Sequence, residues 1–259
     1  MEDDRINNGC VRVAGLEWAT ENLAVTPSGR KEFRGTGHVI GDFFQWASHP
    51  GHCGEENENE GDKGLTLYTS FLSRSCGDCA NALSFKECGM IYCPEDAPYR
   101  NGGDGPCYTK YTGTDMRTVL EAVDDPASVI LGEGWRMPTR AEFQALRDAT
   151  FWAWDEEDRG YYVFGPEDWH PAGSRSGVIP AGLDKGEALL FFPAAGCCSN
   201  TCFWSLLTPS GNYWSSSLYR NNREYAYDLF FISKAIDPQG ICRRHGGMSI
   251  RPVRDCMIE

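Results

Sequence analysis

The side chains of this 259-residue chain that are best suited to chemistry are its 12 cysteines. Thiolates bind zinc when four of them come together, commonly as two pairs with short spacers. One group of cysteines has spacings of this kind: Cys76, Cys79, Cys88 and Cys93. The even total and the further partners Cys10, Cys53 and Cys107 favour disulfides instead. We expect disulfides to stabilise this cysteine-rich insertion, at about 49–111, with zinc or free thiols as the alternatives.

The other reactive side chains of the chain give little indication of a catalytic site. The adjacent Cys197 and Cys198, with Cys202 nearby, are placed to form a bridge to the cysteines near the C-terminus. A loop over 49–64 is rich in carboxylates but lacks the twelve-residue pattern of a calcium loop, so we expect a solvated acidic loop. The five histidines are scattered and match no hydrolase arrangement. We therefore predict no catalytic residue and no cofactor.

The C-terminal part of the chain has a residue pattern that indicates ligand binding rather than catalysis. Residues 225–233 partly alternate in polarity, as in a strand that is buried on one face. If Leu229 and Phe231 face a core, Phe230 and Ile232 face outward beside a Tyr- and Arg-rich group: Tyr219, Arg220, Arg223, Arg243, Arg244 and His245. Exposed Tyr, Arg and Phe in one patch are typical of a binding surface. The alternative is that both faces of the strand are buried.

The charge of the chain narrows the class of ligand. The formal net charge is −13, which disfavours nucleic-acid binding by the protein. A local group of arginines in an acidic molecule fits a protein or a glycan better than a phosphate backbone. No apolar run approaches the roughly 18–20 residues of a membrane span, and the acidic first residues are unlike a secretion signal.

The elements that must position this surface are mainly short strands. Alternating or apolar runs predict four strands besides the C-terminal ones: 11–19, 151–154, 161–164 and 189–196. Thr139 as N-cap, with Glu142 closing a capping box, predicts a helix from 139 to 146. We predict a second, shorter helix that begins over 118–123. Together these elements indicate one domain over 10–256, with antiparallel strands, about two helices and long loops.

Six short motifs occur in order between residues 11 and 253. They are Gly15-Leu16-Glu17-Trp18-Ala19, Val119-Leu120-Glu121 with Asp124-Asp125, Gly134-Trp135-Arg136-Met137-Pro138-Thr139 with Glu142-Phe143, Phe192-Pro193-Ala194-Ala195-Gly196, Tyr213-Trp214-Ser215-Ser216-Ser217, and Ser249-Ile250-Arg251-Pro252-Val253. In this order they resemble the Fibrobacter succinogenes major paralogous domain family, bacterial domains with a C-type-lectin-like fold. The third and fifth motifs also resemble the formylglycine-generating-enzyme branch of that fold. The resemblance implies an α+β, C-type-lectin-like fold.

That branch includes variable proteins that are diversified by retroelements, in which a reverse transcriptase rewrites the adenines of Asn-type codons near the C-terminus. The resemblance implies such a variable region here, at about 213–253, which binds a protein or glycan on a cell or phage-host surface. It also implies that the protein itself is located at a cell surface, outside the cell or on a phage particle. Its candidate ligand-binding positions carry residues reachable from an Asn codon: Tyr219, Arg220, Asn221, Asn222, Arg223, Tyr225, Tyr227, Asp228, Phe230, Ile232, Ile241, Cys242, Arg243, Arg244 and His245. Interleaved positions look constant: Trp214, Ala226, Leu229, Phe231, Ser233, Pro238 and Gly246.

The same branch implies an alternative function. Formylglycine-generating oxidases use a cysteine pair to activate oxygen, and the candidates for such a pair are Cys197, Cys198, Cys202 and Cys242. The many other cysteines favour a structural role for these thiols. Calcium-dependent sugar binding is disfavoured, because the Glu-Pro-Asn, Gln-Pro-Asp and Trp-Asn-Asp signatures of C-type lectins are absent. We therefore expect a binding protein rather than an enzyme.

Overall fold

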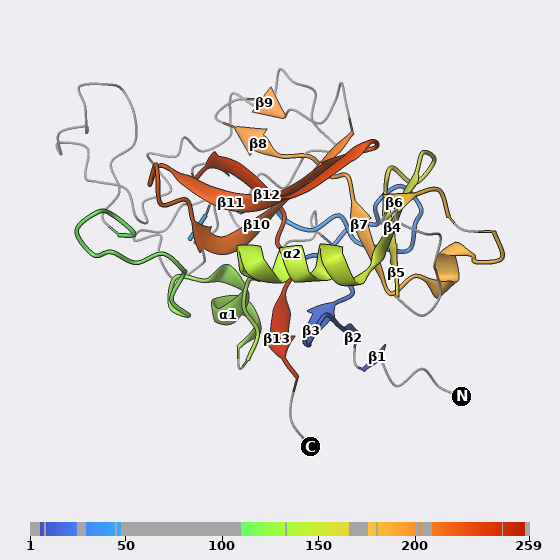
Figure 1. The fold of residues 1–259 in the computed structure, drawn as a ribbon, viewed down its shortest axis with the longest axis horizontal. Coiled ribbons are helices and arrows are strands. Elements are labelled where there is room, and N and C mark those ends of the chain that lie inside the picture. The colour runs from blue at the N-terminus through green and yellow to red at the C-terminus, as the bar shows by residue number, and fades with distance from the viewer. Residues whose placement is uncertain are drawn as a thin grey trace.

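The chain adopts an α+β architecture of short strands, mostly antiparallel, with two α-helices and the short 3-10 helix η4 (Lys185–Glu187) in the parts that the structure describes (Figure 1). This computed structural model describes residues 6–7, 9–24, 30–44, 46–47, 110–132, 134–165, 176–179, 181–199, 202–203, 209–244 and 246–256. Nearly all of the insertion at about 49–111 lies outside these ranges. The cysteines expected to bind zinc or form disulfides there, and the acidic loop over 49–64, lie outside them too.

One sheet joins the two ends of the chain (Figure 1). Its strands are β1 (Ile6–Asn7), β2 (Cys10–Val13), β3 (Leu16–Ala19) and β13 (Val253–Asp255), and β13 pairs with β3. The prediction of a single strand over 11–19 is wrong, because the chain turns back at Ala14 and Gly15. Both residues have positive φ, of 52° and 79°, which a tight turn accepts and an extended strand does not.

The second sheet confirms the strands predicted in the middle of the chain. Its order is β6 (Ser176–Gly177), β4 (Phe151–Asp155), β5 (Gly160–Phe164) and β7 (Leu190–Pro193). The charged turn between β4 and β5 is closed by the Asp155 carboxylate, which accepts hydrogen bonds from the backbone N–H groups of Glu157 and Asp158.

The third sheet contains the C-terminal region predicted to bind ligand. Its antiparallel strands are β10 (Ser210–Leu218), β11 (Tyr225–Ile232) and β12 (Ala235–Arg243), with β11 in the centre. The register shifts between Trp214 and Leu218 on β10, and again beside Asp228 and Phe230 of β11. A separate two-stranded pair is formed by β8 (Cys198–Ser199) and β9 (Cys202–Phe203).

Helix α2 (Arg140–Ala149) lies across one side of this third sheet and contacts all three of its strands (Figure 1). The capping box predicted from the sequence is confirmed: the Thr139 side chain accepts from the Glu142 N–H, and the Glu142 carboxylate accepts from the Thr139 N–H. Phe143 and Leu146 form the buried side of the helix. A local cap and an amphipathic pattern therefore position α2 against the sheet.

The helix predicted to begin over 118–123 is wrong. Val119 instead forms an antiparallel bridge with Ser217, so this segment extends the sheet beyond β10. The Leu218 N–H donates to the Thr118 carbonyl, and the Leu120 N–H donates to the Ser216 carbonyl. The helix α1 (Pro126–Leu131) begins only after Asp125, whose carboxylate caps it. Neither α1 nor α2, the α-helices of the described ranges, is long and apolar enough to cross a membrane.

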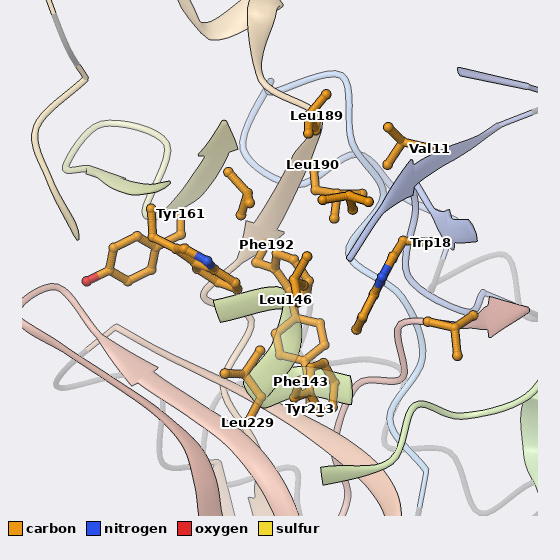
Figure 2. Close-up of a cluster of buried hydrophobic side chains, with 14 of the residues drawn as sticks. Val11, Trp18, Phe143, Leu146, Tyr161, Leu189, Leu190, Phe192, Tyr213 and Leu229 are labelled. Carbon is orange, nitrogen blue, oxygen red and sulfur yellow. The ribbon is translucent and has the colours of Figure 1, made fainter. Parts of the chain in front are cut away.

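One of the clusters of buried side chains, rich in aromatic residues, contains residues from all three sheets and from α2. Figure 2 shows Trp18 of β3, Phe143 of α2, Phe192 of β7 and Tyr213 of β10 converging with Leu229 of β11, and these residues belong to one cluster of buried side chains. Close packing of this kind resists rearrangement, so the strands of the third sheet are held in fixed positions.

The buried Arg251 explains the motif near the C-terminus. Its guanidinium donates to the Asn22 side-chain oxygen at 2.7 and 3.0 Å and to the Phe191 carbonyl at 2.7 Å. It also lies 4.6 Å from the centre of the Phe192 ring. A buried charge is tolerated when every donor is used in this way. Arg251 thus connects the N-terminal segment, β7 and the C-terminal segment.

Candidate ligand-binding face

The central strand β11 has buried side chains on both sides of the sheet, at positions 226, 228, 229 and 231. Ala226, Leu229 and Phe231 are fully buried, whereas Tyr225 and Tyr227 are half-buried. Since residues two apart on a strand point to the same side, the two tyrosines share a side of the sheet with Leu229 and Phe231. The prediction that Leu229 and Phe231 face a core is confirmed.

At one end, this side of the sheet is covered by α2 and belongs to the core. At the other end it is surface, because α2 does not extend over it. Phe143, in the middle of α2, packs in the cluster that contains Leu229 and Phe231. Arg140, the first residue of α2, lies over Tyr227, with its guanidinium carbon 4.5 Å from the ring centre. Beyond Arg140 the helix no longer covers the sheet, and the side chains of that end are open to solvent.

Five residues predicted to bind ligand come together at this open end: Tyr219, Tyr225, Tyr227, Ile241 and Arg243. We call these five the binding face. Tyr219 and Tyr227 meet edge to face with ring centres 5.4 Å apart, and Arg243 Nε donates to the Tyr225 hydroxyl at 3.2 Å. Ile241 pairs with Tyr227 across the strands and is 46% exposed. The binding face thus contains side chains of β11 and β12, together with Tyr219, which directly follows β10.

The turn between β10 and β11 borders the binding face. Arg220, Asn221 and Asn222 are exposed on it. The Asn221 side-chain amide donates to the Tyr219 hydroxyl at 3.3 Å, and Arg223 donates to the carbonyl of Arg117 at 2.9 Å. The structure therefore places these four predicted residues next to the binding face, with Arg223 anchored to the preceding segment.

The structure separates four other predicted residues from the binding face: Asp228, Phe230 and Ile232 of β11, and Cys242 of β12, which pairs with Ala226 on the opposite side of the sheet. Asp228, Phe230 and Ile232 point to the opposite side of the sheet, because they occupy the even positions of β11. Phe230 and Ile232 are half-buried and Asp228 is buried. The expectation that Phe230 and Ile232 lie beside Tyr219 and Arg243 is therefore wrong.

The environment of Asp228 is unusual for a carboxylate. Its Oδ2 accepts from the Asn212 side-chain amide at 3.2 Å, while Oδ1 has no hydrogen-bond partner among the described residues. Burial raises the pKa of Asp228 to about 7. In such an environment the neutral acid is more stable than the carboxylate. Because Asp228 is buried, it is not placed to contact a ligand in solution.

The thiols near Asp228 do not have the character of activated nucleophiles. Burial, together with the Asp228 carboxyl, raises the pKa of Cys197 to about 11 and that of Cys242 to about 12. A reactive thiol requires the opposite shift, since the thiolate is the reactive form. Both cysteines are free thiols, as is Cys256, so Cys197 makes no bridge to Cys242 or Cys256. The side chains of Cys198 and Cys202 lie outside the described set.

Arg244 was predicted to be exposed, and this is wrong. It is fully buried and lies 4.7 Å from the ring centre of Trp46. Its guanidinium donates to the backbone carbonyls of Lys110 and Arg223, each at 3.1 Å. The residue after a strand turns inward here, where these carbonyls offer acceptors in place of water. Arg244 is a structural residue, while His245 lies outside the described residues.

Two residues of the open end, Arg140 and Val119, were not predicted from the sequence. Arg140 donates its backbone N–H to the Ser217 hydroxyl and covers Tyr227, and Val119 pairs with Ser217 and is 44% exposed. Both precede the region predicted to vary. Only the contact of α2 and of the 118–120 segment with the third sheet reveals them, and no local pattern encodes that contact.

Comparison with protein-family models, curated proteins and solved structures finds no match. Among the described residues, no group of three or more His, Cys, Asp or Glu side chains is arranged to hold a metal ion. The open end of the third sheet, with its tyrosines and arginines, is accordingly the best candidate for a functional site in this part of the chain.

Proposed function

We propose that this protein is a ligand-binding display protein with a C-type-lectin-like fold. Its binding face, the adjoining turn at 220–223 and the rest of the region at about 213–253 recognise a protein or glycan. A retroelement changes this region at the level of the gene. The protein acts at a cell surface, outside the cell or on a phage particle, and the protein itself binds no nucleic acid.

One observation carries the proposal. Six of the seven positions that look constant in the sequence are buried and the seventh, Ser233, is half-buried, whereas most described positions reachable from an Asn codon are at least partly exposed. The buried constant positions are Trp214, Ala226, Leu229, Phe231, Pro238 and Gly246. Among the positions reachable from an Asn codon, Asp228 and Arg244 are exceptions, because they are buried. A core that excludes the exchangeable positions can keep its packing while the surface chemistry changes.

The composition of the binding face suits recognition of varied ligands. Tyr side chains supply large contact areas and lose little conformational freedom, and Arg supplies several directed donors. Both residue types are enriched among the residues that dominate binding energies. The ring of Tyr227 is already held by Arg140 and Tyr219, so less ordering is needed when a ligand binds.

The formylglycine-generating type of oxidase is the alternative. It requires a thiolate pair, and the raised pKa values of Cys197 and Cys242 weigh against these two thiols. We therefore keep the binding protein as the proposal. Copper-dependent oxygen consumption with a cysteine-containing peptide as substrate distinguishes the two functions, and we expect none.

The proposal is tested by sequencing the gene in many cells of one strain. We expect substitutions at the adenines of codons for binding-face residues and for the turn at 220–223. Positions 228 and 244 should vary far less, because their side chains are buried. A gene that is uniform across cells, or that varies equally at Leu229 and Phe231, would contradict diversification of a displayed face.

A further inference from the structure

The open end of the third sheet has a charge opposite to that of the whole molecule. Arg140, Arg220, Arg223 and Arg243 lie in or beside the binding face, with Glu224 and the exposed ion pair of Arg117 and Glu121 as charged neighbours. The complete chain has a formal net charge of −13. A local excess of arginines in an acidic molecule attracts an anionic partner to this one place and repels it elsewhere.

Two of these arginines have unused capacity for a carboxylate. Among the described residues, Arg140 and Arg220 have no acidic group within salt-bridge distance. Arg140 is nevertheless fixed, because its backbone N–H donates to Ser217 Oγ at 3.1 Å and its guanidinium rests on Tyr227. A guanidinium with a fixed plane is well suited to bind a carboxylate through two parallel hydrogen bonds.

The tyrosines of the binding face offer little flat surface. The guanidinium of Arg140 lies over the ring of Tyr227, and that of Arg243 lies 5.8 Å from the ring centre of Tyr225. Tyr219 stands edge to face against Tyr227. Stacking of a ring or base requires an uncovered aromatic face. The guanidinium and hydroxyl groups of these residues are hydrogen-bond donors.

Aliphatic side chains flank the donors. Val119 and Ile241 are 44% and 46% exposed, and they pair with Ser217 and Tyr227, respectively. Arg140 contacts both Ser217 and Tyr227, so Val119 and Ile241 lie on the same side of the sheet at opposite ends of one row. Apolar groups beside a group of donors match a peptide in which carboxylates are followed by aliphatic side chains.

We propose that the partner of this face is an acidic protein segment, whose Asp or Glu carboxylates bind the arginines and whose aliphatic side chains contact Val119 and Ile241. Arg140, outside the region of exchange, is a fixed carboxylate contact, so changes at the binding face select among acidic segments. This inference rests on the proposed function, because it takes the binding face as the site of recognition.

The experiment uses a displayed library of random twelve-residue peptides, selected on the immobilised full chain. We expect the recovered peptides to be enriched in Asp and Glu next to Leu, Ile or Val, and to lose affinity as salt is raised. Arg140→Gln should weaken their binding about tenfold, as expected for loss of one charge-assisted contact. Arg30→Gln is the matched control: Arg30 is exposed on a turn far along the chain from α2, and its loss should leave binding unchanged.

The outcomes separate the two proposals. If peptides bind and depend on Tyr227 and Arg243 but are not acidic, or are insensitive to Arg140→Gln, the acidic partner is wrong and the binding face stands. If glycans on an array bind through those residues while no peptide does, the partner class is likewise wrong. If the recovered peptides bind equally well when Tyr219, Tyr227 and Arg243 are replaced, the proposed function itself fails.

Discussion

Arg243 and Arg244 are neighbours in sequence and have different roles in the structure. Arg243 is exposed and contacts Tyr225 of the binding face, whereas Arg244 is buried against Trp46 and binds carbonyl groups of a distant segment. The identity of a residue thus says little about its role at this end of the chain. The direction in which the backbone turns after β12 decides it.

Replacing each arginine separately measures this difference. Arg244→Ala should lower the free energy of unfolding by about 3 kcal/mol, because it removes several charge-assisted hydrogen bonds and a contact with an aromatic ring. Arg243→Ala should change it by less than about 0.5 kcal/mol, as surface substitutions usually do. Urea denaturation of both variants gives the comparison. Equal losses would show that the two side chains have similar structural roles.

Asp228 makes the stability of the fold depend on pH. The folded state holds the proton of this carboxyl up to a pKa of about 7, well above the ordinary value of 3.8. As the pH rises from about 4 to about 7, the unfolded chain releases that proton before the folded one does. The contribution of Asp228 to the free energy of unfolding therefore falls with rising pH and is constant again above about 7.

The variant Asp228→Asn carries no proton that can be lost here. As the pH rises from 5 to 8, the free energy of unfolding of Asp228→Asn minus that of the wild type should increase by about 2–3 kcal/mol. Denaturation of both proteins at the two pH values tests this, with Glu156→Gln, an exposed acid in the turn between β4 and β5, as the control. The prediction is contradicted if the difference between Asp228→Asn and wild type is the same at pH 5 and pH 8.

At the scale of elements, α2 determines where the third sheet is core and where it is surface. Its first residue, Arg140, marks the limit of coverage, and that position is fixed by the capping box of Thr139 and Glu142. The segment 118–120 completes the other side of the open end through its bridge to Ser217. The binding face is therefore bounded by elements that precede it in the chain.

Thr139→Ala removes one half of the capping box. We expect a loss of about 1 kcal/mol in the free energy of unfolding, which is typical of an N-cap. Ligand-selected peptides should also bind less tightly, since the guanidinium of Arg140 is positioned by the same turn. Thr114→Ala, at an exposed threonine, is the control for both measurements. An unchanged unfolding energy would show that the cap contributes nothing to the helix.

Local signals in the sequence predicted some of these elements well. The helix from Thr139 and the hairpin of β4 and β5 were predictable, because a capping box and a charged turn act within a few residues. The segment 118–123 was not, because its hydrogen-bond partners lie on β10, about a hundred residues later. The division of the candidate site was also hidden. Alternation along β11 separates two sides, but it does not show that α2 covers only part of one of them.

The whole molecule combines a firmly packed frame with an open sheet end. Buried aromatic residues from all three sheets and the buried Arg251 link segments from both termini to β7 and β10. The acidic frame carries a local group of arginines at the open end. In this account, the frame supplies rigidity, and the side chains of the binding face supply the specificity.

The central claim is that the binding face can be exchanged without loss of the fold. The most direct measurement is the free energy of unfolding of a variant with Tyr219, Tyr225, Tyr227, Ile241 and Arg243 all replaced by Thr, which favours strands. We predict a loss of at most about 2 kcal/mol for this variant, against more than about 4 kcal/mol for the matched change of Leu229 and Phe231 to Thr. A five-residue variant that is as unstable as the matched variant would contradict the account.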